Sequence, residues 1–244
     1  MIEQKSLESS VYPKLKFCYK ISIMKKRILV FASGTKEGGG SGFQELVEFS
    51  RTQPPVLDAE IVAVVSHYPQ GGVFQKAAKL KVPFEYWPGP FEAAGYQQLV
   101  KKYQADFVMC SGWLKFVRGL DPTKTINIHP APLPQFGGKG MYGHFVHEAV
   151  IAAFRRGEIT QTAVTIHFVD EVAFDHGPII FQLPILIRPD DDAESLAKRV
   201  NEKERAWQSY ILNLVVQGEI YLKDGRVCFS GRGRVFETNT SLQT

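Results

Sequence analysis

The sequence predicts an α/β fold, a mostly parallel and twisted sheet with helices on both faces. Two observations support this prediction. Short apolar runs typical of buried parallel strands alternate with segments whose apolar residues recur at helical spacing. The chain of 244 residues is also 44% hydrophobic and 12% aromatic, which is enough for a substantial core. This alternation favours right-handed crossovers and ligand binding at the carboxyl ends of the strands.

Composition narrows the possible functions. The 29 basic and 25 acidic residues give a net charge of +4, which suits an anionic small molecule better than nucleic acid. Cys18, Cys110 and Cys228 form no CxxC pair, so they predict neither a disulfide framework nor a thiolate metal site. No apolar run approaches the roughly 20 residues of a membrane span. We therefore expect a soluble cytoplasmic protein without nucleic-acid or membrane partners.

One domain is expected over residues 24–230. The charged segment Met24-Lys25-Lys26-Arg27 precedes the first apolar run, and residues 1–23 form an extension to which no function is assigned. Residues 231–244 are interpreted as a polar tail. No internal repeat or linker rich in Pro, Gly or Ser divides the region between them.

The first strand, expected at 28–31, leads into a glycine-rich loop over 34–42 and a helix over 43–49. Strand, glycine loop and helix in this order build an anion site, because backbone N–H groups and the helix amino terminus favour negative charge. We predict a phosphate site here, although neither G-x-G-x-x-G nor a Walker lysine motif is present. A flexible loop is the alternative.

The alternation continues through the middle of the chain. Strands are expected at 59–66, 82–86 and 107–111, and helices at 73–80 and 96–103. The segment 112–117 follows the last of these strands. Since parallel strands share one carboxyl edge, this segment and the glycine loop should reach the same side of the sheet.

An amide and an imidazole, Asn127 and His129, end the next apolar segment. Residues i and i+2 of an extended segment point to the same face, and the proline-rich run 130–134 stiffens the chain immediately after them. Together the two side chains suit a carbonyl oxygen that needs a donor and an acid/base group. A strand end whose histidine caps a loop is the alternative.

A second glycine-rich loop, 136–143, precedes a predicted helix at 144–156. Lys139 within the loop does not indicate a nucleotide site, because no strand leads in and no Ser or Thr follows it. His144 and His147 supply only two ligands, so no metal is expected.

A strand at 162–169 leads to Asp175, which precedes a glycine-proline turn and a further strand at 179–182. An Asx-turn is the simple interpretation of Asp175. Its functional interpretation needs a partner, and His129 is the candidate, because a carboxylate beside an imidazole raises the imidazole pKa.

The last predicted elements are a helix and a hairpin. The acidic triplet 190–192 caps a helix over 193–216, with Gly218 at its end. An Asp-Gly turn within 219–229 then predicts the hairpin.

Three segments together resemble the folate-dependent formyltransferases, in particular phosphoribosylglycinamide formyltransferase. They are Asn127-Ile128-His129-Pro130, the stretch 165–178, and the glycine loop 38–44, and the resemblance spans about residues 25 to 222 in consistent order. It implies a single domain with a Rossmann-like sheet. It also implies 10-formyltetrahydrofolate as formyl donor and glycinamide ribonucleotide as acceptor in purine synthesis, with the protein acting as a monomer or homodimer.

The resemblance implies three groups of site residues. The catalytic group is Asn127, His129 and Asp175. The group that binds the phosphate and ribose of the acceptor is Gly40, Ser41, Gly42, Asn201 and Glu204. The group that binds folate is Leu114, Lys115, Phe116, Val117, Asn127, Val169, Asp170 and Asp175.

The sequence departs from the family at three places. In the first place, the loop 34–40 is longer than in the family, and Gly42 stands where the family commonly has Asn or Thr. The segment 167–175 is one residue longer than its family counterpart. The segment 91–94 lacks the arginine that contacts folate in the family. Two alternatives therefore stay open. One is formyl transfer to another amine, such as an amino sugar nucleotide, and the other is a non-catalytic folate- or nucleotide-binding module.

Overall fold

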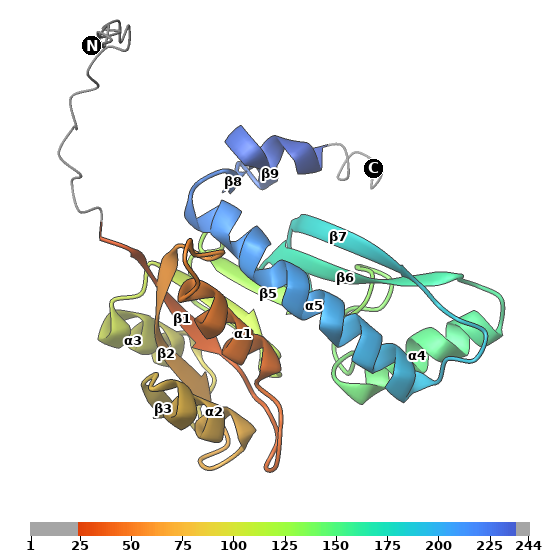
Figure 1. Ribbon diagram of the computed structural model, residues 1–244, viewed down its shortest axis with the longest axis horizontal. Helices are drawn as coiled ribbons and strands as arrows, with labels where there is room; N and C mark the ends of the chain where they lie inside the picture. The colour runs from red at the N-terminus through yellow and green to blue at the C-terminus, as the bar shows by residue number, and fades with distance from the viewer. Residues whose placement is uncertain (1–23, 238–244) are drawn as a thin grey trace, which may run out of the picture.

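A seven-stranded sheet organises the protein, for which a computed structural model describes residues 24–237 (Figure 1). The strand order is β3-β2-β1-β4-β5-β6-β7, parallel from β3 to β5 and antiparallel at β6 and β7. The strands are β1 (Lys26–Phe31), β2 (Ala59–Ser66), β3 (Phe84–Tyr86), β4 (Phe107–Ser111), β5 (Thr125–His129), β6 (Gln161–Phe168) and β7 (Ile179–Leu186). The mostly parallel sheet is confirmed. The predicted extension 1–23, with Cys18, lies outside the described residues.

Helices cover both faces of this sheet. They are α1 (Ser41–Ser50), α2 (Gly72–Leu80), α3 (Ala93–Tyr103), α4 (His144–Arg155) and α5 (Ala193–Val216). The apolar side chains of α3 belong to one core cluster, whereas those of the other four helices belong to the cluster on the opposite face. A hairpin of β8 (Ile220–Lys223) and β9 (Arg226–Phe229) follows α5. No helix within residues 24–237 is long and apolar enough to cross a membrane.

The central strand β1 shows why its sequence is continuously apolar. Ile28 and Val30 point into the larger core cluster, and Leu29 and Phe31 point into the cluster beneath α3. All four side chains are 0% exposed. Because neighbouring residues of a strand face opposite sides, a strand covered on both sides needs apolar residues at every position.

The sheet brings three loops together at its carboxyl edge. β1 pairs with β2 on one side and β4 on the other, so the chain changes direction along the sheet at this point. Just past the strand ends, the Ser33 N–H donates to the Gly112 carbonyl at 3.0 Å, and the Leu114 N–H donates to Ser33 Oγ at 2.9 Å. The loops that follow β1 and β4 are therefore joined beside the end of β5.

Some predicted boundaries differ from the structure. β7 extends to Leu186, beyond the predicted end at residue 182, because Pro184 lies on an edge strand where its missing N–H breaks no interior ladder. The predicted polar tail is wrong over 231–236, which form the 3₁₀ helix η1 (Gly231–Phe236). Its Phe236 is buried and packs edge-on against Phe181, with ring centroids 5.5 Å apart.

Candidate active site

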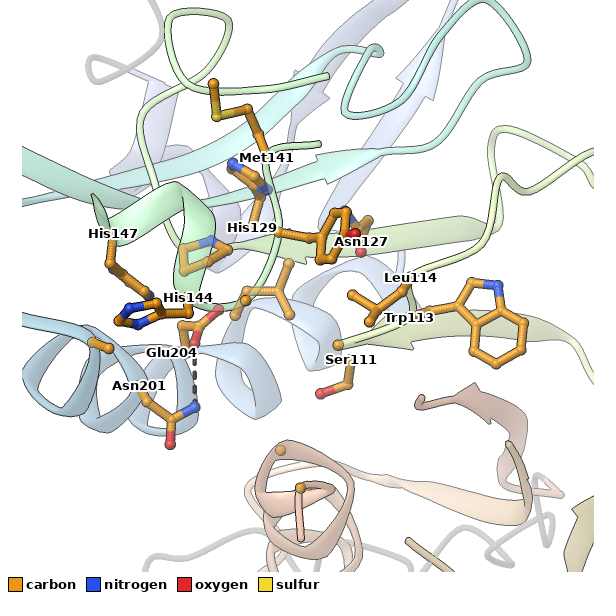
Figure 2. A pocket seen from close by; sticks show the side chains of 18 of the residues that line it. Ser111, Trp113, Leu114, Asn127, His129, Met141, His144, His147, Asn201 and Glu204 are labelled. Atoms are coloured by element: carbon orange, nitrogen blue, oxygen red, sulfur yellow. Dashed lines mark hydrogen bonds between the residues drawn. The ribbon is translucent and has the colours of Figure 1, made fainter. Parts of the chain in front are cut away.

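A cavity of about 670 Å³ lies at the carboxyl edge of the sheet. Its walls come from the loop before α1, the segment after β4, the end of β5, the glycine loop before α4, and α5. Figure 2 shows Asn127 and His129 on one side, with Asn201 and Glu204 on α5 across from them. The prediction that separate loops meet at this edge is confirmed.

Asp175 is the point at which the polar groups of the cavity converge. Asn127 Nδ2 donates to Asp175 Oδ1 at 3.3 Å, and His129 Nδ1 lies 3.5 Å from the same oxygen. The Gly138 N–H donates to the other carboxylate oxygen at 3.1 Å. Asp175 adopts the left-handed backbone conformation, with φ of 53°, which directs its side chain among these groups. The predicted pairing of Asp175 with His129 is confirmed.

His129 is a buried imidazole whose two nitrogens have different partners. Nε2 lies 2.8 Å from the Phe136 carbonyl, so Nε2 carries the proton and donates. Nδ1 is then the atom that gains a proton when the ring becomes charged. Burial lowers the pKa of His129 below its usual value, although Asp175 acts in the opposite direction. The prediction that Asp175 raises this pKa to a useful range is therefore wrong in its net direction, because desolvation is the larger effect.

His167 of β6 is a site residue that the sequence did not single out. Its Nδ1 donates to the Phe168 carbonyl at 2.7 Å, which leaves Nε2 to accept from Asn127 Nδ2 at 3.1 Å. Burial lowers the pKa of His167 to about 4, so Nε2 stays an acceptor at neutral pH. His167 thereby fixes the orientation of the Asn127 amide. The signal that could have identified it is the strand register, in which these two residues are direct partners.

The predicted acceptor-binding residues meet at the other end of the cavity. Gly40, Ser41 and Gly42 form the amino end of α1, where Gly40 has a φ of 74°. The Ser41 hydroxyl lies 3.4 Å from Asn201 Oδ1, and Asn201 Nδ2 donates to Glu204 at 3.3 Å. Burial raises the pKa of Glu204 to about 7. The free N–H groups of the helix end and this pair of α5 residues thus face the same space.

The predicted folate-binding residues divide between two spaces. Leu114 lines the large cavity, whereas Lys115, Phe116, Val117 and Val169 line a neighbouring pocket of about 40 Å³. Asn127 and Asp175 lie at the boundary and contribute to both. Phe174 also borders both spaces and packs on Phe116 with ring centroids 4.9 Å apart.

Asp170 is the predicted folate residue that borders neither space. Its carboxylate lies 2.6 Å from His176 Nδ1, and the same side chain accepts from the Val172 N–H at 3.0 Å. These contacts direct the Asp170 side chain toward its own loop. Its role in folate binding stays a prediction.

The sequence profile of the formyl transferases matches residues 26–212. The chain belongs to the formyl transferase family. It is 33% identical over 221 residues to the chloroplastic phosphoribosylglycinamide formyltransferase of Vigna unguiculata, covering 84% of this chain and 66% of that protein. It is 30% identical over 197 residues to the phosphoribosylglycinamide formyltransferase of Bacillus subtilis, covering 77% of this chain and 93% of that protein.

Solved structures agree with this membership. Glycinamide ribonucleotide transformylase 1 from Symbiobacterium toebii aligns with a TM-score of 0.73 at 25% identity, covering 88% of this chain and 99% of that one. A formyltetrahydrofolate deformylase from Pseudomonas syringae aligns with a TM-score of 0.67 at 22% identity, which supports the shared fold alone.

This formyl transferase has a physical reason for Gly42, where the resemblance leads one to expect Asn or Thr. A Cβ at this position would lie 2.2 Å from Ser111 Oγ, well inside contact distance. The Ser111 hydroxyl donates to Gln208 Oε1 at 3.0 Å, and Gln208 Nε2 donates to the Gly42 carbonyl at 2.9 Å. Ser111 and Gln208 therefore tie the start of α1 to β4 and α5. Neither was predicted as a site residue, because no local pattern reveals a contact between such distant segments.

The cavity is also lined by histidines outside the predicted catalytic group. His147 lines the cavity near the start of α4, and burial lowers its pKa to about 4. His144 also lines the cavity, and its Nε2 lies 3.1 Å from Glu148 Oε1, one helical turn away. Within residues 24–237, no three side chains of the kinds that bind metals come together.

Proposed function

We propose that this formyl transferase moves the formyl group of 10-formyltetrahydrofolate to the amine of glycinamide ribonucleotide, a step of purine synthesis. One observation carries the proposal. Asn127, His129 and Asp175 converge at one end of a cavity whose other end is the glycine loop and the amino end of α1. A phosphorylated amine bound at the helix end has its reactive group directed toward the polar trio. The relatives of about 30% identity that carry the name of this enzyme add support.

In the proposed reaction, the acceptor amine attacks the formyl carbon. A new C–N bond forms, the carbonyl oxygen gains negative charge, and collapse of the intermediate breaks the bond from the formyl carbon to the folate nitrogen. Asn127 Nδ2 and protonated His129 Nδ1 stabilise the oxyanion. His129 is neutral before substrate binds, so Nδ1 takes up the proton that the attacking amine loses and passes it to the departing folate nitrogen.

Asp175 contributes through charge and position. Its carboxylate lies next to the atom of His129 that becomes protonated, and so it stabilises the imidazolium in a buried environment. The folate donor is proposed to lie along Leu114–Val117 and against Val169 and Asp175, with the ring of Phe174 moving to admit it. The formyl folate is consumed as a co-substrate.

A formyl-transfer assay tests the proposal. The purified protein is mixed with 10-formyltetrahydrofolate and, in separate reactions, glycinamide ribonucleotide, an amino sugar nucleotide, or no amine. We expect formylation of glycinamide ribonucleotide and little release of formate without an amine. Turnover restricted to the amino sugar nucleotide would assign a different acceptor, and folate binding without turnover would indicate a binding module.

The setting of the reaction is also a proposal. We propose that the only partners the reaction needs are its small-molecule substrates. The protein acts in the cytoplasm as a monomer or homodimer, without a nucleic-acid or membrane partner. Some relatives carry the word chloroplastic in their names, so the compartment differs within the family. Sedimentation analysis with and without substrates distinguishes the two oligomeric states.

A further inference from the structure

A polar stripe on α5 meets the first two turns of α1. Asn201, Arg205 and Gln208 recur at i, i+4 and i+7, the spacing that places side chains on one helix face. Asn201 contacts Ser41, and Gln208 donates to the Gly42 carbonyl. The outer two residues of the stripe thus reach the predicted phosphate loop, and Arg205 lies between them.

Arg205 is held by an incomplete ion pair. Its Nε lies 4.0 Å from Glu45 Oε2, beyond hydrogen-bonding distance. The Nε atom of Arg205 and the other carboxylate oxygen of Glu45 are both buried without a hydrogen-bond partner. A guanidinium has five N–H donors and no way to lose its charge at neutral pH. Arg205 therefore has N–H donors available for an anion that it can reach more closely than the Glu45 carboxylate.

The helix geometry places this cation close to the phosphate loop. Ser41 faces Asn201 and, one turn later on both helices, Glu45 faces Arg205. A turn is about 5.4 Å, and helical side chains lean toward the amino end of their helix. Arg205 therefore leans toward the Ser41 end, and it lines the same cavity as the loop.

We propose that Arg205 is a specificity-determining residue that leaves Glu45 and binds the phosphate of the acceptor at the amino end of α1. This inference rests on the proposed function and identifies the side-chain cation that recognises the phosphorylated substrate. Guanidinium groups bind phosphate through two parallel hydrogen bonds, while the N–H groups of the helix end take the remaining oxygens.

The movement of Arg205 from Glu45 to the acceptor phosphate changes the protonation of Glu45. Burial raises the pKa of Glu45 to about 7, with Arg205 opposing this effect and Glu48 adding to it. When Arg205 turns to the phosphate, Glu45 loses its cation and its pKa rises further, so acceptor binding is accompanied by proton uptake. Other charged groups lie around the loop and its cavity. Lys36 and Glu37 belong to the loop, and Lys76 on α2 passes beside Gly40. The cavity is also lined by Lys139 before α4 and by Glu194 and Glu204 on α5.

The central experiment compares wild type with Arg205→Gln and Arg205→Lys on two acceptors, glycinamide ribonucleotide and the same molecule without its phosphate. Loss of a charged hydrogen-bonding group typically weakens binding by about 10- to 100-fold. We expect Arg205→Gln to raise KM for the phosphorylated acceptor by this factor. KM for formyl folate, kcat, and KM for the dephosphorylated acceptor should change less than about 2-fold, a margin well below one charged hydrogen bond. Arg205→Lys should be intermediate.

Lys198→Gln provides the matched control. It removes one positive charge from the same helix at a separate surface pocket that it shares with Arg199, and it should leave every KM unchanged. Lys76→Gln tests whether Lys76, the lysine beside Gly40, binds the acceptor phosphate in place of Arg205. An unchanged KM for glycinamide ribonucleotide in Arg205→Gln, or an equal loss with both acceptors, overturns the inference. Lack of turnover by wild type would instead refute the proposed function.

Direct binding separates the two proposals further. Ribose 5-phosphate serves as the probe, and calorimetry in buffers of different ionisation enthalpy measures proton uptake. We expect binding to wild type with proton uptake near pH 7, weak binding to Arg205→Gln, and binding to Glu45→Gln without proton uptake. Equal binding to wild type and Arg205→Gln overturns the inference even if the true acceptor is another phosphorylated amine.

Discussion

The buried polar groups around Asn127 leave it little freedom. Its amide nitrogen has two N–H groups, one directed at His167 Nε2 and the other at Asp175 Oδ1. The second bond, at 3.3 Å, is the longer, so this N–H is the one available to an incoming oxygen. In the proposed reaction, His129 provides the second donor once Nδ1 is protonated. The proposed chemistry thus depends on two atoms that share one carboxylate.

Replacement of either donor tests this assignment. Asn127→Ala and His129→Ala should each lower kcat by on the order of 100- to 1000-fold, the usual effect of losing one oxyanion donor. The measurement is single-turnover formyl transfer, with circular dichroism and thermal unfolding to establish that each variant folds. Near wild-type turnover in either folded variant would refute the assignment.

His167 makes stability depend on pH. Its pKa of about 4 in the folded protein lies below its usual value of 6.5, so the unfolded chain binds the proton more readily. Its contribution is fully present above pH 6.5 and is lost as pH falls toward 4. Between pH 7.5 and 5, this linkage lowers the free energy of unfolding by about 2 kcal/mol. Urea unfolding of wild type and His167→Gln measures the effect. The decrease should be about 2 kcal/mol smaller in the variant, and equal decreases would contradict the prediction.

At the scale of helices and strands, α1 is fixed to the sheet and to α5 by its first turn. Gly42 has no room for a side chain because Ser111 and Gln208 occupy the space beside it. Both partners are buried, so they cannot move aside without breaking hydrogen bonds. The position of the proposed phosphate site therefore depends on a contact between three separate elements.

Gly42→Ala tests this dependence. We expect a lower melting temperature and at least a 10-fold rise in KM for the acceptor, because a displaced helix end loses charged hydrogen bonds to phosphate. Gly38→Ala is the control within the same loop, since a Cβ there meets only Thr35 Oγ1 at 3.7 Å. Ser111→Ala removes the nearest clashing atom, so it should restore part of the loss when combined with Gly42→Ala. Additive effects of the two substitutions would contradict the steric explanation.

Local patterns predicted these elements well and their contacts poorly. The apolar runs at 59–66 and 107–111 coincide with β2 and β4, because burial on both faces leaves a continuous signal. The stiff segment at Asn127 and His129 was also predictable, since i and i+2 share a face. Gln208 was not, because its importance comes from contacts to residues more than 90 positions away. The predicted direction of the His129 pKa was wrong for a related reason, since desolvation depends on the packed environment.

In the whole molecule, the core and the cavity lie on different parts of the sheet. Two core clusters fill the faces, and the cavity occupies the carboxyl edge where the chain changes direction beside β1. Every side chain assigned to the proposed reaction lies within residues 24–237. We therefore predict that function at this edge does not require the segment before Met24.

A chain that begins at Met24 tests the proposed domain boundary. We expect kcat and both KM values to stay within about 2-fold of the full-length protein, since termini outside the core tolerate truncation. Steady-state kinetics and thermal unfolding of the two chains provide the comparison. A large loss of activity would place part of the site in residues 1–23.

The hydrogen bond from Asn127 to Asp175 has one further consequence. Because this N–H already has a carboxylate partner, a bound formyl group must exchange with it, and a neutral carbonyl gains little from the exchange. An oxygen that carries a developing negative charge gains more. In the proposed reaction, the Asp175 carboxylate therefore competes with the formyl oxygen for this N–H. The N–H then stabilises the transition state more than the ground state. Its removal should reduce the rate of the chemical step far more than the affinity for either substrate.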